Sequence, residues 1–273
     1  MEERVLNLTE AEQAILDAAV EAAHTSKDFI PENSSTLLVN ESTSRFSSAI
    51  WYEKIQEQRV TLVGLGGIGG YVAYLLGRMQ IASLTMYDDD VIDSSNLSGQ
   101  FYPVLSVGQK KTDGTYDALI RYSNYYKVYA FSRKFTASEP CQKVMICGLD
   151  NMSSRKTCFL TWLNYVNKLP VEERASCLFI DGRLAAEEFQ VFCMRGCDGY
   201  LVSEYTDKWL FGDSEAEETI CSYKQTSFCA NMIASVIVNL FVNFVANMCD
   251  PLIERELPFF TYYSAENMFF KTK

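Results

Sequence analysis

Residues 62–70 read LVGLGGIGG, with five glycines in the seven positions that end the stretch. The apolar run RVTLVG leads into them, and GYVAYLLGRMQ follows with helical spacing of its apolar residues. Gly64-x-Gly66-x-x-Gly69 therefore predicts a strand, a turn and a helix. The first glycine would make the turn, the second would admit a ligand to the backbone, and the third would pack the helix on the strand. The helix N-terminus would add an anion site. A purely structural turn is the alternative.

The second predicted strand, SLTMYD, ends in three acids, Asp88, Asp89 and Asp90. They follow the glycines by about 20 residues, which is where a ribose-binding carboxylate lies in dinucleotide-binding units. A solvated strand end is the alternative, and it explains Asp89 better than Asp88. Glycines and carboxylate together favour nucleotide binding, and this spacing alone fits NAD as well as ATP.

Strands and helices alternate along the rest of the chain. This order predicts an α/β fold with a doubly wound, mostly parallel sheet and a Rossmann-like nucleotide-binding half. Residues 9–24 are expected to form a helix within an N-terminal extension over 1–44, and 45–273 a single domain. The acidic and aromatic stretch 200–220 is expected to be an exposed crossing loop. The further predicted strands are KVYAFSRKF, QKVMICGLD, SCLFIDGR and FQVFCMRG, and the further helices are KKTDGTYDALIRY and SSRKTCFLTWLNYVNKL.

Composition narrows the class of protein. The 273 residues carry a formal net charge of −11, which argues against general binding to nucleic acid or to anionic membranes, because both need basic patches. The nine cysteines are irregularly spaced, which is typical of reduced thiols rather than of a disulfide framework. The acidic N-terminus, MEERVLNLTE, lacks the apolar stretch of a secretory signal. We therefore expect a cytoplasmic protein.

The uncharged segment 227–249 is long enough to span a membrane. A polar residue recurs at every fourth position, which places a polar stripe along one face of a helix. This pattern favours a buried or dimer-forming helix over a membrane helix. The polar residues are Asn231, Ser235, Asn239, Asn243 and Asn247.

Three stretches, YDDDVIDSSNLSGQFY, SVGQKK and CGLDNMSSRK, follow one another in that order. Together they resemble the ThiF/MoeB family of adenylating enzymes, which are related to ubiquitin-activating enzymes. The resemblance runs from about Arg45 to about Phe244 and implies a ThiF-type fold. It also implies an adenylyltransferase that uses ATP and Mg²⁺ and works as a homodimer. Its substrate would be the C-terminal carboxylate of a ubiquitin-like or sulfur-carrier protein with a flexible tail.

Other readings stay open at this point. Within the class, the substrate could be a small-molecule or peptide carboxylate, or a tRNA base, although the negative charge counts against tRNA. Outside it, the chain could be a non-catalytic nucleotide-binding protein that kept the fold. A nicotinamide-dependent oxidoreductase is the third reading, but it leaves VGQKK and GLDN unexplained.

The resemblance assigns roles to single residues. Asp88 would bind the ribose hydroxyls, Lys111 the phosphates and Asp150 the Mg²⁺, while Arg155 completes the family's D-N-x-x-x-R. The catalytic set would be Lys111, Asp150, Cys221 and Arg45. The nucleotide-binding set would be Gly64, Gly66, Gly67, Ile68, Gly69, Asp88, Asp90, Asn96, Gln100, Lys111, Leu149 and Asn151.

These residue types suit adenylation. A carboxylate attacks the α-phosphorus and pyrophosphate leaves, so the site must neutralise and align two anions. Lys111 and a Mg²⁺ held by Asp150 would do so, because Mg²⁺ prefers oxygen ligands. No general base is required, since the attacking carboxylate is already ionised. The single histidine, His24, is expected at the surface.

Two departures from the family pattern concern arginines. The family's N-x-x-R-Q is Asn96-Leu97-Ser98-Gly99-Gln100 here, and its R-Y-x-R-Q is reduced to Arg45-Phe46-Ser47-Ser48. An arginine's fork of donors is matched to phosphate. We expect a basic residue, Arg45, Lys110 or Arg183, to fill the space beside Gly99. The alternative is nucleotide binding without efficient adenylation.

One cysteine is a candidate for chemistry. Cys221 lies just before the long helix, where the family's acyl-accepting cysteine lies, and Lys224 could lower its pKa. A small residue filling a loop is an equal alternative. Zinc is not expected, because Cys193-x-x-x-Cys197 has no second pair.

Overall fold

The computed structural model describes residues 43–212, 225–249 and 254–273. The helix expected over 9–24, together with Cys221 and Lys224, lies outside the described residues. The extension expected over 1–44 and its boundary stay a prediction.

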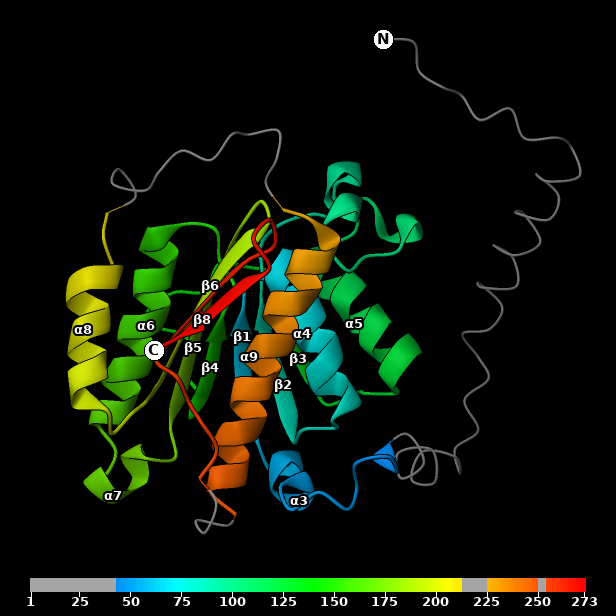
Figure 1. Cartoon of the computed structure of the whole chain (residues 1–273). Helices are drawn as coiled ribbons and strands as arrows, with labels where there is room; N and C mark the ends of the chain where they lie inside the picture. Colours follow the sequence, from blue (N-terminus) through cyan, green and yellow to red (C-terminus); the bar gives the residue numbers. More distant parts are fainter. Residues whose placement is uncertain (1–42, 213–224, 250–253) are drawn as a thin grey trace, which may run out of the picture. The chain divides into compact units, whose positions relative to one another are not determined.

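Eight strands form one sheet in the order β3-β2-β1-β4-β5-β6-β7-β8 (Figure 1). The first five in that order are parallel, and β6, β7 and β8 join antiparallel. The predicted α/β fold with a mostly parallel sheet is confirmed. The bounds are β1 Arg59–Val63, β2 Ser83–Tyr87, β3 Val128–Phe131, β4 Val144–Cys147, β5 Leu178–Ala185, β6 Glu188–Arg195, β7 Phe260–Ser264 and β8 Phe269–Thr272.

Helices cover both faces of this sheet (Figure 1). Helices α4, α5 and α9 lie on one side, and α6 and α8 lie on the other. Short helices complete the described fold. The bounds are α3 Tyr52–Gln56, α4 Gly67–Arg78, η2 Ser94–Ser98, η3 Val104–Ser106, α5 Lys111–Ser123, α6 Met152–Asn167, α7 Val171–Arg174, α8 Gly199–Trp209 and α9 Ser227–Asn247.

The central strands are apolar without a break because both of their faces are buried. In β1, Val60 and Leu62 belong to the core cluster under α4 and α9, whereas Val63 belongs to the cluster under α6 and α8. Strand β4 divides its side chains in the same way. Successive side chains of a strand point to opposite faces, so a single apolar run supplies two cores.

Helix α9 is the uncharged segment singled out in the sequence. It packs beside α4, and residues such as Ile233, Ile237 and Phe241 are fully buried. The polar stripe faces outward, because Asn231, Ser235 and Asn239 are exposed. Within the described residues, α9 is one helix with the length and composition to cross a membrane, and here its apolar side lies in the core, as the stripe predicts.

The expected exposed loop over 200–220 is wrong for its first half. Residues Gly199–Trp209 form α8, and Tyr205 is fully buried against α6 and the sheet. Leu201, Val202 and Trp209 pack partly buried beside it. Their spacing is helical, but acids and lysine between them hid the apolar face.

Strands β7 and β8 are also absent from the expected strands. They form a hairpin after α9 and extend the antiparallel edge of the sheet. All four residues of β8 are exposed, so this strand carries no alternating pattern that would have revealed it.

A buried ion cluster joins α8 to the centre of the sheet. The Asp181 carboxylate at 0% exposure accepts hydrogen bonds from Arg155, from Arg183 Nε at 2.8 Å and from the Tyr205 hydroxyl at 2.9 Å. Arg183 also donates to the Trp209 carbonyl at 2.9 Å and lies over the Phe192 ring. Burial raises the pKa of the Tyr205 phenol, which therefore stays a donor.

Replacing Tyr205 by Phe should lower the free energy of unfolding by about 1.5–3 kcal/mol, because a buried carboxylate loses a donor. Urea unfolding at pH 7 would measure it. Tyr200→Phe on the same helix is the matched control, since Tyr200 is 76% exposed, and it should change stability by less than about 0.5 kcal/mol. Equal stability of the two variants would show that the cluster does not depend on Tyr205.

Candidate functional site

The candidate site lies where the carboxyl ends of β1, β2 and β4 meet. Gly64 follows β1, Asp88 follows β2 and Asp150 comes shortly after β4. The connections from β1 and from β4 leave for opposite faces of the sheet, through α4 and α6 respectively. Such a switch point opens a crevice at the strand ends, and ligands of open α/β sheets bind there.

The glycines of residues 64–70 serve two purposes: some allow close packing of the backbone, and one leaves the backbone accessible to a ligand. Gly64 has φ +87°, and a Cβ there would lie 2.7 Å from the Gly148 carbonyl oxygen. A Cβ at Gly69 would lie 1.8 Å from the Gly64 carbonyl oxygen. At Gly66, by contrast, nothing lies nearer than Gln100 Nε2 at 4.0 Å. Gly64 and Gly69 are therefore required by the turn and by close packing, whereas Gly66 leaves its backbone accessible to a ligand.

Asp88 is bound to the glycine loop. Its Oδ2 accepts a hydrogen bond from the Leu65 N–H at 2.7 Å, and its Oδ1 accepts one from the Asp90 N–H at 2.9 Å. Burial raises the pKa of Asp88, while the Leu65 bond and the charge of Lys111 oppose that rise. Asp89 is exposed, so the solvated strand end describes Asp89 and not Asp88.

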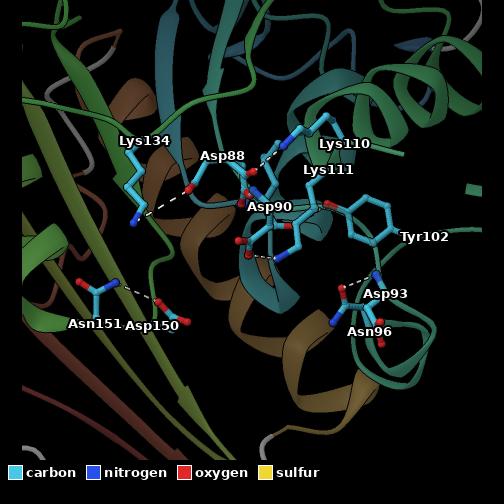
Figure 2. A network of polar contacts seen from close by, with 12 residues as sticks. Asp88, Asp90, Asp93, Asn96, Tyr102, Lys110, Lys111, Lys134, Asp150 and Asn151 are labelled. Carbon is cyan, nitrogen blue, oxygen red and sulfur yellow. Dashed lines mark hydrogen bonds and ion pairs between the residues drawn. The ribbon is translucent and has the colours of Figure 1, made fainter. Parts of the chain in front are cut away.

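Three lysines balance the three acids (Figure 2). Lys111 is 7% exposed, and its Nζ lies 2.6 Å from Asp90 Oδ2. Lys110 donates to the Asp89 carbonyl at 2.8 Å, and the Lys134 ammonium lies 3.9 Å from the Asp89 carboxylate. In a chain with an overall excess of acid, the three lysines thus offset the charge of the three acids at the strand ends.

The tyrosine of SGQFY is a positioning residue that the sequence did not reveal. The Tyr102 hydroxyl donates to the Leu65 carbonyl at 2.6 Å and lies 3.3 Å from Thr115 Oγ1. The loop that carries it is closed at its base by a bridge between Val91 and Lys110. Tyr102 therefore ties this loop and α5 to the glycine turn.

The GLDN stretch opens α6. Asn151 is the N-cap, because its Oδ1 accepts the Ser154 N–H at 2.9 Å, and its Nδ2 donates to Asp150 Oδ1 at 3.1 Å. Asp150 is exposed and faces the strand ends (Figure 2). Arg155 lies below, donating to the Leu149 carbonyl and to Asp181. Arg155 therefore holds the loop in place rather than facing a ligand.

The other residues expected to bind nucleotide lie around the same turn. Asn96 Oδ1 accepts the Asp93 N–H at 3.0 Å and so helps to cap η2 (Figure 2). The Ile68 side chain is buried, which leaves only its backbone for a ligand. The Oε1 of Gln100 is buried and has no partner among the described residues. An unpaired polar atom and an open backbone at Gly66 are features that a polar ligand would satisfy.

The space beside Gly99 is filled by Gln225, and not by a basic residue. A Cβ at Gly99 would lie 2.8 Å from Gln225 Cγ. This corrects the expectation that an arginine or lysine occupies it. Gln225 was missed because it lies 126 positions further along the chain, in no recognisable motif.

The three candidate cations have other places. Arg183 is bound to Asp181 and to α8. Arg45 precedes Phe46, whose ring stacks on Trp51 before α3, at the amino end of β1. The glycine turn, by contrast, follows the carboxyl end of β1. Lys110 alone of the three lies at the strand ends.

The residues present fit a nucleotide and a magnesium ion. The glycine turn, Asp88 and Lys111 could hold ribose and phosphates, and Asp150 offers an exposed carboxylate to Mg²⁺. Among the described residues, one group of three acids is close enough to share a metal ion, Asp88, Asp89 and Asp90. Two of its members are already paired, Asp88 with backbone N–H groups and Asp90 with Lys111.

Comparison with known proteins places the chain in a family. The ubiquitin-like modifier-activating enzyme 5 of Caenorhabditis elegans is 38% identical over 69 residues, 25% of this chain and 16% of that enzyme. The molybdopterin-synthase adenylyltransferase of Escherichia coli is 37% identical over 70 residues, 25% of this chain and 28% of that enzyme. The matched stretch thus spans less than a third of either relative.

The fold is shared more widely than the sequence. A crystal structure of Escherichia coli MccB with ATP superposes with a TM-score of 0.58 at 15% identity, covering 98% of this chain and 79% of that one. The sequence pattern of the ThiF family matches residues 39–272, which is nearly the whole chain. The protein therefore belongs to the ThiF family.

Proposed function

We propose that this protein uses Mg-ATP to adenylate a carboxylate. The observation that carries the proposal is the Asp88 carboxylate, half-buried and fixed to the backbone of the glycine turn beside Lys111. A buried carboxylate with raised pKa in a crevice is a candidate functional group. A ribose supplies two hydroxyl donors to it, and the glycine turn and Lys111 supply the positive side that phosphates need.

The chain's residues would act by alignment and charge. A substrate carboxylate oxygen forms a bond to the α-phosphorus while the bond from that phosphorus to the bridging oxygen breaks, and pyrophosphate leaves. No proton has to move. Lys111 would leave Asp90 for the phosphates, since a triphosphate offers it more negative charge. Mg²⁺ held by Asp150 would supply further charge neutralisation to the leaving group.

The substrate we propose is the C-terminal carboxylate of a ubiquitin-like or sulfur-carrier protein. Two relatives, a ubiquitin-like modifier-activating enzyme and a molybdopterin-synthase adenylyltransferase, support this class. A flexible tail is required because the reacting carboxylate must reach the strand ends. Transfer to Cys221 could follow adenylation.

We also propose a homodimer. Arg45 lies at the amino end of the sheet, so it can assist at the phosphates only from a second copy of the chain. In the family pattern R-Y-x-R-Q it is the second arginine that reaches across a dimer to the ATP, and Arg45, which matches the first, would take over that role here.

Asp150→Ala should abolish Mg-dependent ATP–pyrophosphate exchange and leave the melting temperature unchanged. The Asp150 side chain is exposed and, among the described residues, it accepts a hydrogen bond only from its neighbour Asn151. The exchange is measured with radiolabelled pyrophosphate and a Gly-Gly-ended carrier protein. Asp117→Ala, an exposed acid on α5, is the control and should keep wild-type exchange. Normal exchange in Asp150→Ala would remove Asp150 from the site. A wild type that binds ATP but catalyses no exchange would favour a non-catalytic protein.

The affinity for ATP should fall as the pH is lowered toward the raised pKa of Asp88. Ribose hydroxyls need the Asp88 carboxylate ionised, and burial raises its pKa, so protonation sets in at higher pH than the ordinary value of about 3.9. Affinity is therefore present above the raised pKa and lost as pH falls through it. Calorimetric titration should give Asp88→Asn a dissociation constant for ATP about tenfold or more above that of wild type at pH 7. The ratio of the two dissociation constants should become smaller as the pH is lowered, because the wild-type carboxylate is then protonated. Asp89→Asn, which changes the exposed neighbour, is the control and should bind ATP with the same pH dependence as wild type. A ratio of dissociation constants between Asp88→Asn and wild type that does not change with pH would refute the role of Asp88.

A further inference from the structure

The Gln225 side chain fills a slot between two glycines of the candidate site. A Cβ at Gly67 would lie 2.2 Å from Gln225 Oε1, and one at Gly99 would lie 2.8 Å from Gln225 Cγ. At both glycines the three nearest atoms all belong to Gln225. No other side chain limits the size of residues 67 and 99 so closely.

The backbone does not require glycine at these positions. Gly99 has φ −132° and ψ −12°, which other residues adopt, and Gly67 begins the regular helix α4. The close contact at both positions therefore comes from the Gln225 side chain. Positions 67, 99 and 225 form one packing unit, although they lie far apart in the sequence.

The backbone on either side of Gln225 is anchored. Gln225 forms a bridge with Ala186 in the turn between β5 and β6, and the Thr226 N–H donates to the Ala186 carbonyl at 3.3 Å. Thr226 also caps α9, since its Oγ1 accepts the Cys229 N–H at 3.4 Å. The carboxamide is thus held at the first turn of α4 by two elements of the fold.

The Gln225 carboxamide can still donate and accept hydrogen bonds with a ligand. The Gln225 side chain forms no hydrogen bond to another described residue. Both atoms of its carboxamide lie beside the first turn of α4, because a Cβ at Gly67 would lie 2.2 Å from Oε1 and 2.8 Å from Nε2, and Nε2 is also 3.1 Å from the Cβ position of Gly99. The first backbone N–H groups of a helix such as α4 have no partner within the helix. An amide donor beside these groups suits a phosphate oxygen.

We propose that Gln225 binds the phosphates of ATP as a neutral donor, in the space that an arginine at position 99 would otherwise take. This assignment rests on the proposed function, because it needs ATP at the glycine turn. It explains why the chain can have glycine at 99 without leaving the space beside α4 empty.

The first test compares Mg-ATP with adenosine, which lacks phosphates, by calorimetric titration. Gln225→Ala should raise the dissociation constant for Mg-ATP about fivefold, the value of one ordinary hydrogen bond, and leave that for adenosine unchanged. Gln225→Glu should raise the Mg-ATP constant further, because its carboxylate repels phosphate. Gln142→Ala, just before the amino end of β4, is the matched control and should bind both ligands as wild type does.

The results that would contradict the role of Gln225 can be distinguished from one another and from a failure of the proposed function. Tighter Mg-ATP binding by Gln225→Ala would mean that the side chain blocks the site, and unchanged binding would mean that it makes no contact. An equal loss for adenosine and Mg-ATP would indicate a merely structural role. Each result would overturn this assignment while leaving the proposed function standing. A wild type without affinity for Mg-ATP would overturn both.

A second test uses the fact that a side chain at position 99 and the Gln225 side chain would occupy the same space. Gly99→Arg alone should weaken Mg-ATP binding, because its Cβ meets Gln225 Cγ at 2.8 Å. Gly99→Arg combined with Gln225→Ala should bind Mg-ATP at least as tightly as wild type, since a guanidinium then occupies the slot. Such strong non-additivity is expected only for residues in contact. Losses that simply add in the double variant would overturn the assignment.

Discussion

The peptide groups on either side of Leu65 are held from two directions, and the candidate site depends on this. The Leu65 N–H donates to the Asp88 carboxylate at 2.7 Å, and the Leu65 carbonyl accepts from the Tyr102 hydroxyl at 2.6 Å. One residue after Gly64 thus joins the ends of β1 and β2 to the loop before α5. Because Lys111 begins α5, the same two bonds help to fix the position of Lys111 relative to the Asp88 carboxylate.

Charge at the site is arranged locally and not by the chain as a whole. The net charge of −11 would repel ATP, yet each acid at the end of β2 is paired with a lysine or a backbone N–H. Deeper in the fold, Arg155 and Arg183 are both bound to Asp181, so their guanidinium groups do not face the glycine turn. Among the described residues, this leaves Lys110, Lys111, Lys134, the α4 N-terminus and Gln225 as candidate donors near the glycine turn.

Local patterns predicted the parts of the fold that one stretch of chain decides. The glycine turn, the acid after β2 and the strands around them follow from periodicity and from the φ +87° that Gly64 adopts. Helix α8 was missed because acids and a lysine interrupt its apolar face, and the burial of Tyr205 depends on side chains of other elements such as Phe179 and Asp181. Gln225 and Tyr102 were missed for the same reason. Their roles come from contacts across the fold, and neither residue belongs to a motif that marks such contacts.

The central claim is that the carboxyl ends of β1 and β2 bind ATP. A crystal structure of the protein with Mg²⁺ and a non-hydrolysable ATP analogue tests it most directly. We predict the ribose hydroxyls on the Asp88 carboxylate, and the phosphates between the first turn of α4, Gln225 and Lys111. A nucleotide bound elsewhere, or a glycine turn that stays free of ligand at saturating analogue, would contradict the account.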